Sequence, residues 1–230
     1  MDWTNLDKVE FAITTHCQAK CPLCARTNKQ TLEKVNWLPL HHLSLNEYKN
    51  AVDQLLPNKD IDFCGDYGDP IMHPQIEDFI DYAVQKNHNV SVHTNGGIRT
   101  KDWYVKIAKK YGQKVLIVFA IDGIDEETNS KYRIGVDFNR AWENMLAHAK
   151  NSNSSTVWNF LVFDFNHHQL DEAYKICKEN NIEFIPHMNS RVTKYYDHII
   201  KDLTLRVQLE QKCATMYDPM KIQRVSSYVN

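Results

Sequence analysis

The sequence predicts an α/β fold in which six parallel strands alternate with five long helices. Short apolar runs recur along the 230 residues, and most are followed by a stretch whose apolar residues have helical spacing. The nearly continuous apolar run at 114–122 is typical of a buried strand. This alternation favours parallel strands joined by right-handed crossovers. The pattern leaves two architectures open, a doubly wound sheet and an incomplete β/α barrel.

Each element follows from a local signal. The first strand is expected at 8–15, and the first helix at 44–56, because Ser44 and Glu47 have the spacing of a capping box. A later helix should end at Gly112. The other expected strands cover 60–64, 89–94, 114–122, 156–165 and 182–188, and the other expected helices cover 73–87, 100–112, 138–151 and 167–180.

Composition excludes several classes of protein. Lys and Arg total 27 and Asp and Glu total 29, so the chain has no electrostatic surplus for non-specific nucleic-acid binding. No apolar run approaches the roughly 18 residues of a membrane span. The N-terminus has no basic start followed by an apolar block, so we expect a cytoplasmic protein without a signal peptide. Thiols should then stay reduced, and clustered cysteines point to metal binding or catalysis.

Half of the six cysteines lie in one short stretch, HCQAKCPLCAR at 16–26. Cys17, Cys21 and Cys24 are spaced by four and three residues. A catalytic thiol needs one cysteine and a base, which leaves two of these thiols unexplained. Three thiolates from one loop suit a [4Fe–4S] cluster whose fourth iron stays open to a substrate or cofactor.

Zinc is the alternative occupant of the same loop. Structural zinc sites commonly use four nitrogen or sulfur ligands, often as two paired turns. The sequence has no second cysteine pair, but His16, His41 or His42 could supply a fourth ligand. A non-catalytic zinc- or cluster-binding interaction module therefore remains the rival to an enzyme.

The motif Cys-x-x-x-Cys-x-x-Cys, in a loop directly after the first strand, resembles the radical S-adenosylmethionine (radical SAM) superfamily. The resemblance extends over about residues 8–190 and implies a partial (β/α)₆ barrel. It implies that Cys17, Cys21 and Cys24 hold a [4Fe–4S] cluster with SAM on the open iron. The reduced cluster would cleave SAM to methionine and a 5′-deoxyadenosyl radical, with flavodoxin or ferredoxin as electron donor.

Further segments resemble the parts of this family that bind SAM. FCGDYGDPIMHP at 63–74 is similar to the glycine-rich, acid-ended loop after the second strand, which implies a cofactor-binding role for Tyr67, Gly68 and Asp69. Asp69 would pair with the ammonium group of SAM, although aspartate is shorter than the usual glutamate. HTNGG at 93–97 resembles a Thr-Asn-Gly turn and implies that Asn95 contributes.

The fourth expected strand and the residues around the cysteines complete this set. By resemblance, Asp122 lies near the ribose hydroxyls, and Arg133 is directed at the carboxylate of SAM. Leu23 stands where relatives place an aromatic residue beside the adenine, and would offer an apolar wall. Ala120 replaces a serine that commonly helps to hold SAM, so one hydroxyl contact is missing.

Chemistry in β/α barrels gathers at the carboxyl ends of the strands. Here those ends are polar and rich in histidine, which favours a polar substrate over a lipid. The resemblance makes a peptide the first choice, followed by a nucleotide, a sugar or a small metabolite. The strand-end residues are His16, Cys64, Asp66, His93, Asn95, Asp122, Asp164, Asn166, His187 and Asn189.

The C-terminal part is expected to differ from the barrel. We assign residues 1–190 to the barrel domain and 191–230 to a C-terminal helix with a short extension. The extension resembles the start of a cysteine-rich twitch or SPASM region, with Cys213 as its early cysteine, and is either degenerate or cut short. Cys177, on the apolar face of a helix, should pack in the core, and His73 and His148 should be structural.

Overall fold

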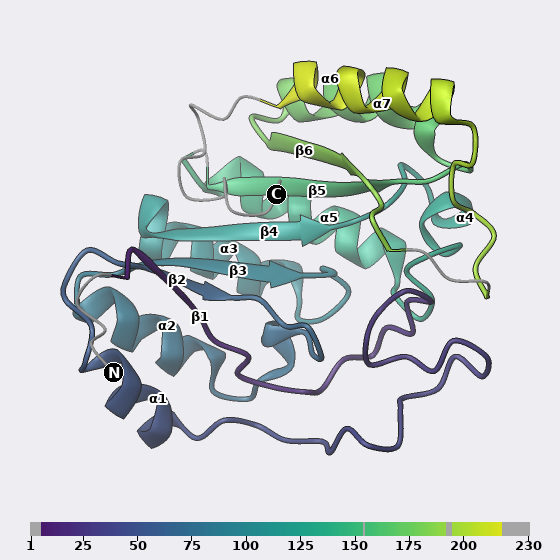
Figure 1. The fold of residues 1–230 in the computed structure, drawn as a ribbon. Helices are drawn as coiled ribbons and strands as arrows, with labels where there is room; N and C mark the ends of the chain where they lie inside the picture. Colours follow the sequence, from purple (N-terminus) through teal and green to yellow (C-terminus); the bar gives the residue numbers. More distant parts are fainter. Residues whose placement is uncertain (1–5, 154, 192–194, 218–230) are drawn as a thin grey trace.

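The computed structural model describes residues 6–153, 155–191 and 195–217, and its six strands form one parallel sheet in the order β1 to β6 (Figure 1). The strands are β1 Lys8–Glu10, β2 Asp60–Phe63, β3 Asn89–Thr94, β4 Val115–Ala120, β5 Thr156–Val162 and β6 Glu183–Met188. Each strand pairs with its sequence neighbours, and within the described residues β1 and β6 are unclosed edges. The predicted α/β class and partial barrel are confirmed.

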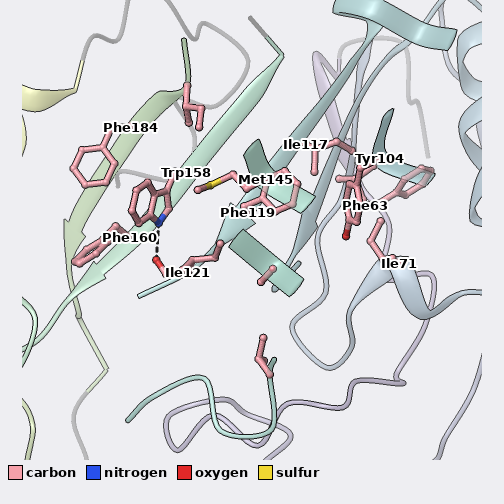
Figure 2. Close-up of a cluster of buried hydrophobic side chains, with 14 of the residues drawn as sticks. Phe63, Ile71, Tyr104, Ile117, Phe119, Ile121, Met145, Trp158, Phe160 and Phe184 are labelled. Atoms are coloured by element: carbon pink, nitrogen blue, oxygen red, sulfur yellow. Dashed lines mark hydrogen bonds between the residues drawn. The ribbon is translucent and has the colours of Figure 1, made fainter. Parts of the chain in front are cut away.

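Helices follow the strands and pack on the outer face of the curved sheet. They are α1 Leu45–Val52, α2 Ile76–Gln85, α3 Lys101–Tyr111, α4 Glu126–Asn129, α5 Phe138–Asn151, α6 Leu170–Glu179 and α7 Leu203–Met216. In the main core, Trp158 of β5 lies among Phe119, Met145 and Phe184 (Figure 2). Its Nε1 donates to the Ile121 carbonyl at 2.7 Å, which joins β5 to the end of β4.

The inner face of the sheet carries a second, smaller apolar cluster. It consists of Leu116, Val118, Val157 and Ile185, with Tyr217 packed against it. These strand residues alternate with the outward-facing core residues, as the two-residue period of a strand requires. The cluster fills part of the inside of the barrel toward the N-terminal ends of β4, β5 and β6.

The first strand is shorter than predicted. It pairs with β2 only over Lys8–Glu10, whereas we expected a strand over 8–15. Beyond it, the Leu43 amide donates to the Ile13 carbonyl at 2.9 Å, and the Thr15 amide donates to the His41 carbonyl at 3.0 Å. The backbone of residues 13–15 is therefore satisfied by the long connection before α1, which lies beside the cysteine loop.

Several predicted limits of helices and strands are confirmed, and others are corrected. Ser44 and Glu47 form the predicted capping box of α1, and α3 ends at Gly112 with φ +52°. The strand predicted at 156–165 ends at 162, and the helix predicted at 167–180 begins at Leu170 after a 3₁₀ turn. The short helix α4 was not expected. Asp125 caps it by accepting from the Thr128 amide at 2.7 Å.

Helix α7 packs beside β6 and joins the main core through Leu209, Cys213 and Met216. Cys177 is 1% exposed, as predicted for a core residue. The division of the chain at residue 190 stays a prediction, and the part of the expected extension at 218–230 lies outside the described residues. None of the helices in the described ranges has the length and apolar character needed to cross a membrane.

Candidate active site

A pocket of about 310 Å³ opens at the carboxyl ends of the strands. Its walls are the cysteine loop, the loop after β2, and residues at or just beyond the ends of β3 to β6. In Figure 1 the long connection between β1 and α1 runs along this end of the sheet. The predicted site residues that line the pocket are Cys17, Cys21, Cys24, Gly68, Asp69, Asn95 and Arg133.

Arg26 holds the cysteine loop in shape. Its guanidinium donates to the carbonyls of Thr15 at 3.3 Å and Cys17 at 3.1 Å, and its Nε donates to the Tyr67 carbonyl at 2.9 Å. Arg26 is only 7% exposed, and these bonds join the cysteine loop to the loop after β2. Arg26 was not predicted as a site residue. Its position two residues after Cys24 was the available signal.

Side-chain N–H groups approach two of the three sulfur atoms. Asn95 Nδ2 lies 3.8 Å from Cys17 Sγ, and Arg133 Nη1 lies 4.0 Å from Cys21 Sγ. The third thiol, Cys24, donates to the Asp66 carbonyl at 3.7 Å. Donors near sulfur stabilise the thiolate form, which is the form that binds metal.

Burial works against ionisation of these thiols. It raises the pKa of Cys17 to about 12, with a further rise from Asp69, and raises the pKa of Cys21 to about 11. Arg133 opposes the rise at Cys21 because its positive charge favours the thiolate. The raised pKa values keep both thiols protonated near pH 7, and a bound metal centre would favour their thiolate forms.

Asp69 links the loop after β2 to the turn after β3. Its Oδ2 accepts from Thr94 Oγ1 at 3.0 Å and from the amide and Nδ2 of Asn95 at 2.9 and 2.6 Å. Its Oδ1 accepts from the Ile71 amide at 3.1 Å. The carboxyl is buried, which raises its pKa, while these hydrogen bonds oppose the rise. Its pairing with a ligand ammonium group stays a prediction.

Gly68 lies where two backbone segments touch. A Cβ atom at this position would come within 2.1 Å of the Thr14 carbonyl oxygen and 3.0 Å of Thr15 Cα. Only glycine allows this approach, so the loop after β2 can pack at Gly68 against the backbone of Thr14 and Thr15. This contact places the neighbouring Asp69 beside Cys17 and Asn95.

Arg133 is positioned by Asp122. Its Nε donates to Asp122 Oδ2 at 2.6 Å, and its guanidinium lies 5.2 Å from the ring centre of Tyr132. Asp122 itself does not line the pocket, and its other oxygen accepts from the Leu161 amide at 2.7 Å. Asp122 therefore joins β4 to β5 and fixes the guanidinium on the pocket wall.

Two other predicted residues reach the site through their backbones. Leu23 is 4% exposed and does not line the pocket, but its carbonyl accepts from Arg191 Nη1 at 3.3 Å. The Tyr67 ring packs edge-to-face on Trp37, with ring centres 5.7 Å apart, and its carbonyl accepts from Arg26. Arg191, which was not predicted, lines the pocket.

The strand-end rim divides into two groups. Those that line the pocket are Cys64, Asp66, His93, Asn95, His187 and Asn189; those that do not are His16, Asp122, Asp164 and Asn166. Asn159, in the middle of β5, also lines the pocket and was missed. It is a polar residue within the otherwise apolar run VWNFLV, which was the signal that could have revealed it.

Comparison with known proteins identifies a family. Residues 11–182 match the family model described as the radical SAM superfamily. A curated relative is the antilisterial bacteriocin subtilosin biosynthesis protein AlbA of Bacillus subtilis (strain 168). It is 26% identical over 124 residues, which cover 54% of this chain and 26% of AlbA.

Two solved structures share the fold. Streptococcus suis SuiB bound to the precursor peptide SuiA superimposes with a TM-score of 0.70 and 19% identity, over 95% of this chain and 47% of SuiB. Native anSMEcpe with bound AdoMet gives a TM-score of 0.63 and 17% identity, over 85% of this chain and 56% of that protein. The chain thus spans about half the length of these structures, and a quarter of AlbA.

The residues of the pocket fit the cofactors that this family uses, a [4Fe–4S] cluster and SAM. Three thiols line one pocket, and two of them have N–H donors beside the sulfur. In the described ranges no three His, Cys, Asp or Glu residues converge on the position of a single metal ion. A cluster instead binds each thiolate through a different iron, so its ligands need not converge.

Proposed function

Because the chain belongs to the radical SAM superfamily, we propose that it is an enzyme that uses a [4Fe–4S] cluster and SAM to abstract hydrogen from a peptide. The observation that supports this most directly is the composition of the pocket. Cys17, Cys21 and Cys24 share it with Gly68 and Arg133, at the strand ends where β/α barrels carry their chemistry.

Cys17, Cys21 and Cys24 would hold the cluster. When bound and reduced, the cluster would split SAM and supply a 5′-deoxyadenosyl radical that abstracts hydrogen from the substrate. Asn95 and Arg133 would stabilise the sulfur atoms through their N–H groups. An electron donor such as flavodoxin or ferredoxin would supply the electron.

SAM would lie against the loop after β2. Gly68 allows close approach of backbone, and Asp69 would face the ammonium group of the methionine part. Arg133 would bind its carboxylate, because the planar guanidinium suits that geometry and Asp122 holds it in place. Leu23 would contribute an apolar surface beside the adenine, and Tyr67 would support the loop through its backbone.

Two comparisons favour a peptide substrate over a nucleotide, sugar or small metabolite. AlbA is named for the biosynthesis of a bacteriocin, and SuiB has been solved with a precursor peptide. The pocket also carries polar groups suited to hydrogen bonding, among them Asn159, His187 and Asn189. Since the chain spans only part of these relatives, the substrate and its binding are part of the proposal.

Production of 5′-deoxyadenosine tests the proposal. Anaerobically reconstituted protein with dithionite and SAM should release 5′-deoxyadenosine slowly without substrate. Cys21→Ala should reduce this to background, whereas Cys177→Ala, a buried cysteine on α6, should leave it unchanged. Stoichiometric zinc with no iron uptake would instead support a zinc-binding interaction module.

A further inference from the structure

Two cations with no role assigned above are bonded to consecutive carbonyls of the cysteine loop. Arg191, which follows β6, donates from Nη1 to the Leu23 carbonyl at 3.3 Å, and Lys29 donates from Nζ to the Cys24 carbonyl at 2.6 Å. Because Leu23 and Cys24 are neighbours in the chain, both positive groups are held on one short stretch of backbone. Of the two side chains, that of Arg191 lines the pocket.

The charges of Arg191 and Lys29 are not balanced by the protein around them. Among the described residues, neither side chain forms an ion pair with a carboxylate. Burial lowers the pKa of Lys29, Cys24 opposes this change, and the charge of Arg191 adds to it, so the two cations lie close enough to repel each other. A place with two neighbouring cations and no counter-charge attracts an anion.

The other two arginines of the pocket already have partners. Arg26 donates to backbone carbonyls from Nε and from both terminal nitrogens, and Arg133 donates from Nε to Asp122. In the described part of the chain, Nε and Nη2 of Arg191 have no such partner. Arg191 is therefore the pocket arginine that is open to a ligand.

The backbone of Arg191 is fixed although its side chain is exposed. The Arg191 amide donates to Asn189 Oδ1 at 3.2 Å, and Asn189 Nδ2 donates to the Arg191 carbonyl at 2.6 Å. Asn189 itself is only 4% exposed. Held by this bracket and by the Leu23 carbonyl, the guanidinium can present the N–H groups of Nε and Nη2, which lie on one edge and suit the two oxygens of a carboxylate.

We infer that Arg191 binds a carboxylate of the peptide substrate through Nε and Nη2, and that Lys29 strengthens the attraction. The inference rests on the proposed peptide function. The carboxylate of SAM is assigned to Arg133 in that proposal, whereas Arg191 follows directly on the strand whose polar groups, His187 and Asn189, are assigned to the peptide. The carboxylate belongs either to an acidic side chain or to the end of the peptide chain.

Two pairs of small probes test the inference. N-acetylglutamic acid α-N-methylamide carries a side-chain carboxylate, and the corresponding glutamine derivative has nearly the same shape without the charge. N-acetylalanine and N-acetylalanine amide form the same contrast for a chain end. Each probe is titrated into reconstituted, SAM-bound protein, and its dissociation constant is measured from the NMR signals of the probe.

We expect the acid of at least one pair to bind about fivefold more tightly than its amide, which is the scale of one partly exposed ion pair. The pair with the larger preference identifies the source of the carboxylate. The preference should shrink at high ionic strength, because salt screens an exposed charge pair. Equal binding of acid and amide in both pairs would overturn the inference.

Variants assign the preference to the cations. Arg191→Gln should remove it, Arg191→Lys should reduce it because the charge stays but the planar fork is lost, and Lys29→Gln should also reduce it. Arg140→Gln is the matched control, because Arg140 is an exposed arginine on α5, and should keep the full preference. Iron content and the thermal midpoint show that each variant is folded.

The remaining outcomes separate this inference from its alternatives. A preference that survives in Arg191→Gln, together with weaker SAM binding or a loss of iron, would show that the cations serve SAM or the cluster, and the inference would be wrong. If the wild type releases no 5′-deoxyadenosine, the proposed function fails. If it does so and neither acid is preferred, only the inference falls.

Discussion

Arg133 donates from Nε to Oδ2 of Asp122 at 2.6 Å, and the Asp122 side chain has no exposed surface. The second carboxylate oxygen accepts from the Leu161 amide at 2.7 Å. Both oxygens of Asp122 thus have partners in the protein. The predicted role of Asp122 at the ribose of SAM stays untested. Its hydrogen bonds indicate instead that Asp122 positions the guanidinium of Arg133.

Asp122→Asn should destabilise the protein by about 3 kcal/mol, because it leaves the guanidinium of Arg133 largely buried without its counter-charge. Guanidinium-chloride unfolding measures the change. Asp137→Asn is the control: Asp137 forms an exposed pair with Arg140 at 3.8 Å and caps α5, and asparagine caps equally well. Its loss should stay below about 1 kcal/mol, so equal losses would contradict a structural role for Asp122.

Gly68→Ala should weaken SAM binding about tenfold or more, because a Cβ atom would push the loop after β2 away from the Thr14 carbonyl. Calorimetric titration of reconstituted protein with SAM measures this. Gly112→Ala tests for a general effect of glycine replacement. Gly112 has φ +52° and open space around it, so its variant should lose about 1–2 kcal/mol of stability while SAM affinity stays unchanged.

Local signals were sufficient for much of the fold. The apolar run of β4 and the capping box of Ser44 and Glu47 depend on neighbours in the sequence, and both are found as predicted. The cysteine spacing and the loop containing Gly68 predicted parts of one pocket, because consecutive β/α units bring their strand ends together.

Features that depend on distant contacts were not predicted. The first strand ends at Glu10 because residues 13–15 bond to the segment 41–43, and nothing near residue 10 indicates this. Arg26 acts through carbonyls that only the folded loop brings together. Asn159 was not predicted, because the apolar residues around it in VWNFLV indicate a buried strand but do not show that its amide faces the pocket.

His148 should make stability depend on pH. It is fully buried on α5, its Nδ1 lies 2.7 Å from Thr156 Oγ1, and burial lowers its pKa to about 3. In the unfolded chain this imidazole binds a proton below about pH 6.5, whereas in the folded chain it stays neutral until about pH 3. Protonation therefore favours the unfolded chain, and the free energy of unfolding falls as the pH decreases from 6.5 toward 3.

Unfolding free energies measured between pH 6.5 and 4.5 test this. His148→Gln stays neutral throughout, so its slope should be shallower than that of the wild type by about 1.4 kcal/mol for each pH unit well below 6.5. The exposed His168→Gln variant should keep the wild-type slope. A slope for His148→Gln equal to that of the wild type would show that the folded protein accepts the proton at this position.

The protein should bind one cluster, with about four irons per chain, and lose it when Cys17, Cys21 or Cys24 is replaced by alanine. The remaining cysteines lie on separate parts of the fold. Cys64 lines the pocket near β2, Cys177 is buried on α6, and Cys213 is buried on α7. A second cluster needs several thiolates close together, which these positions do not provide. Cys64→Ala and Cys213→Ala should therefore keep all four irons in an iron and sulfide assay. About eight irons in the wild type, half of them lost in Cys213→Ala, would instead place a second cluster at α7.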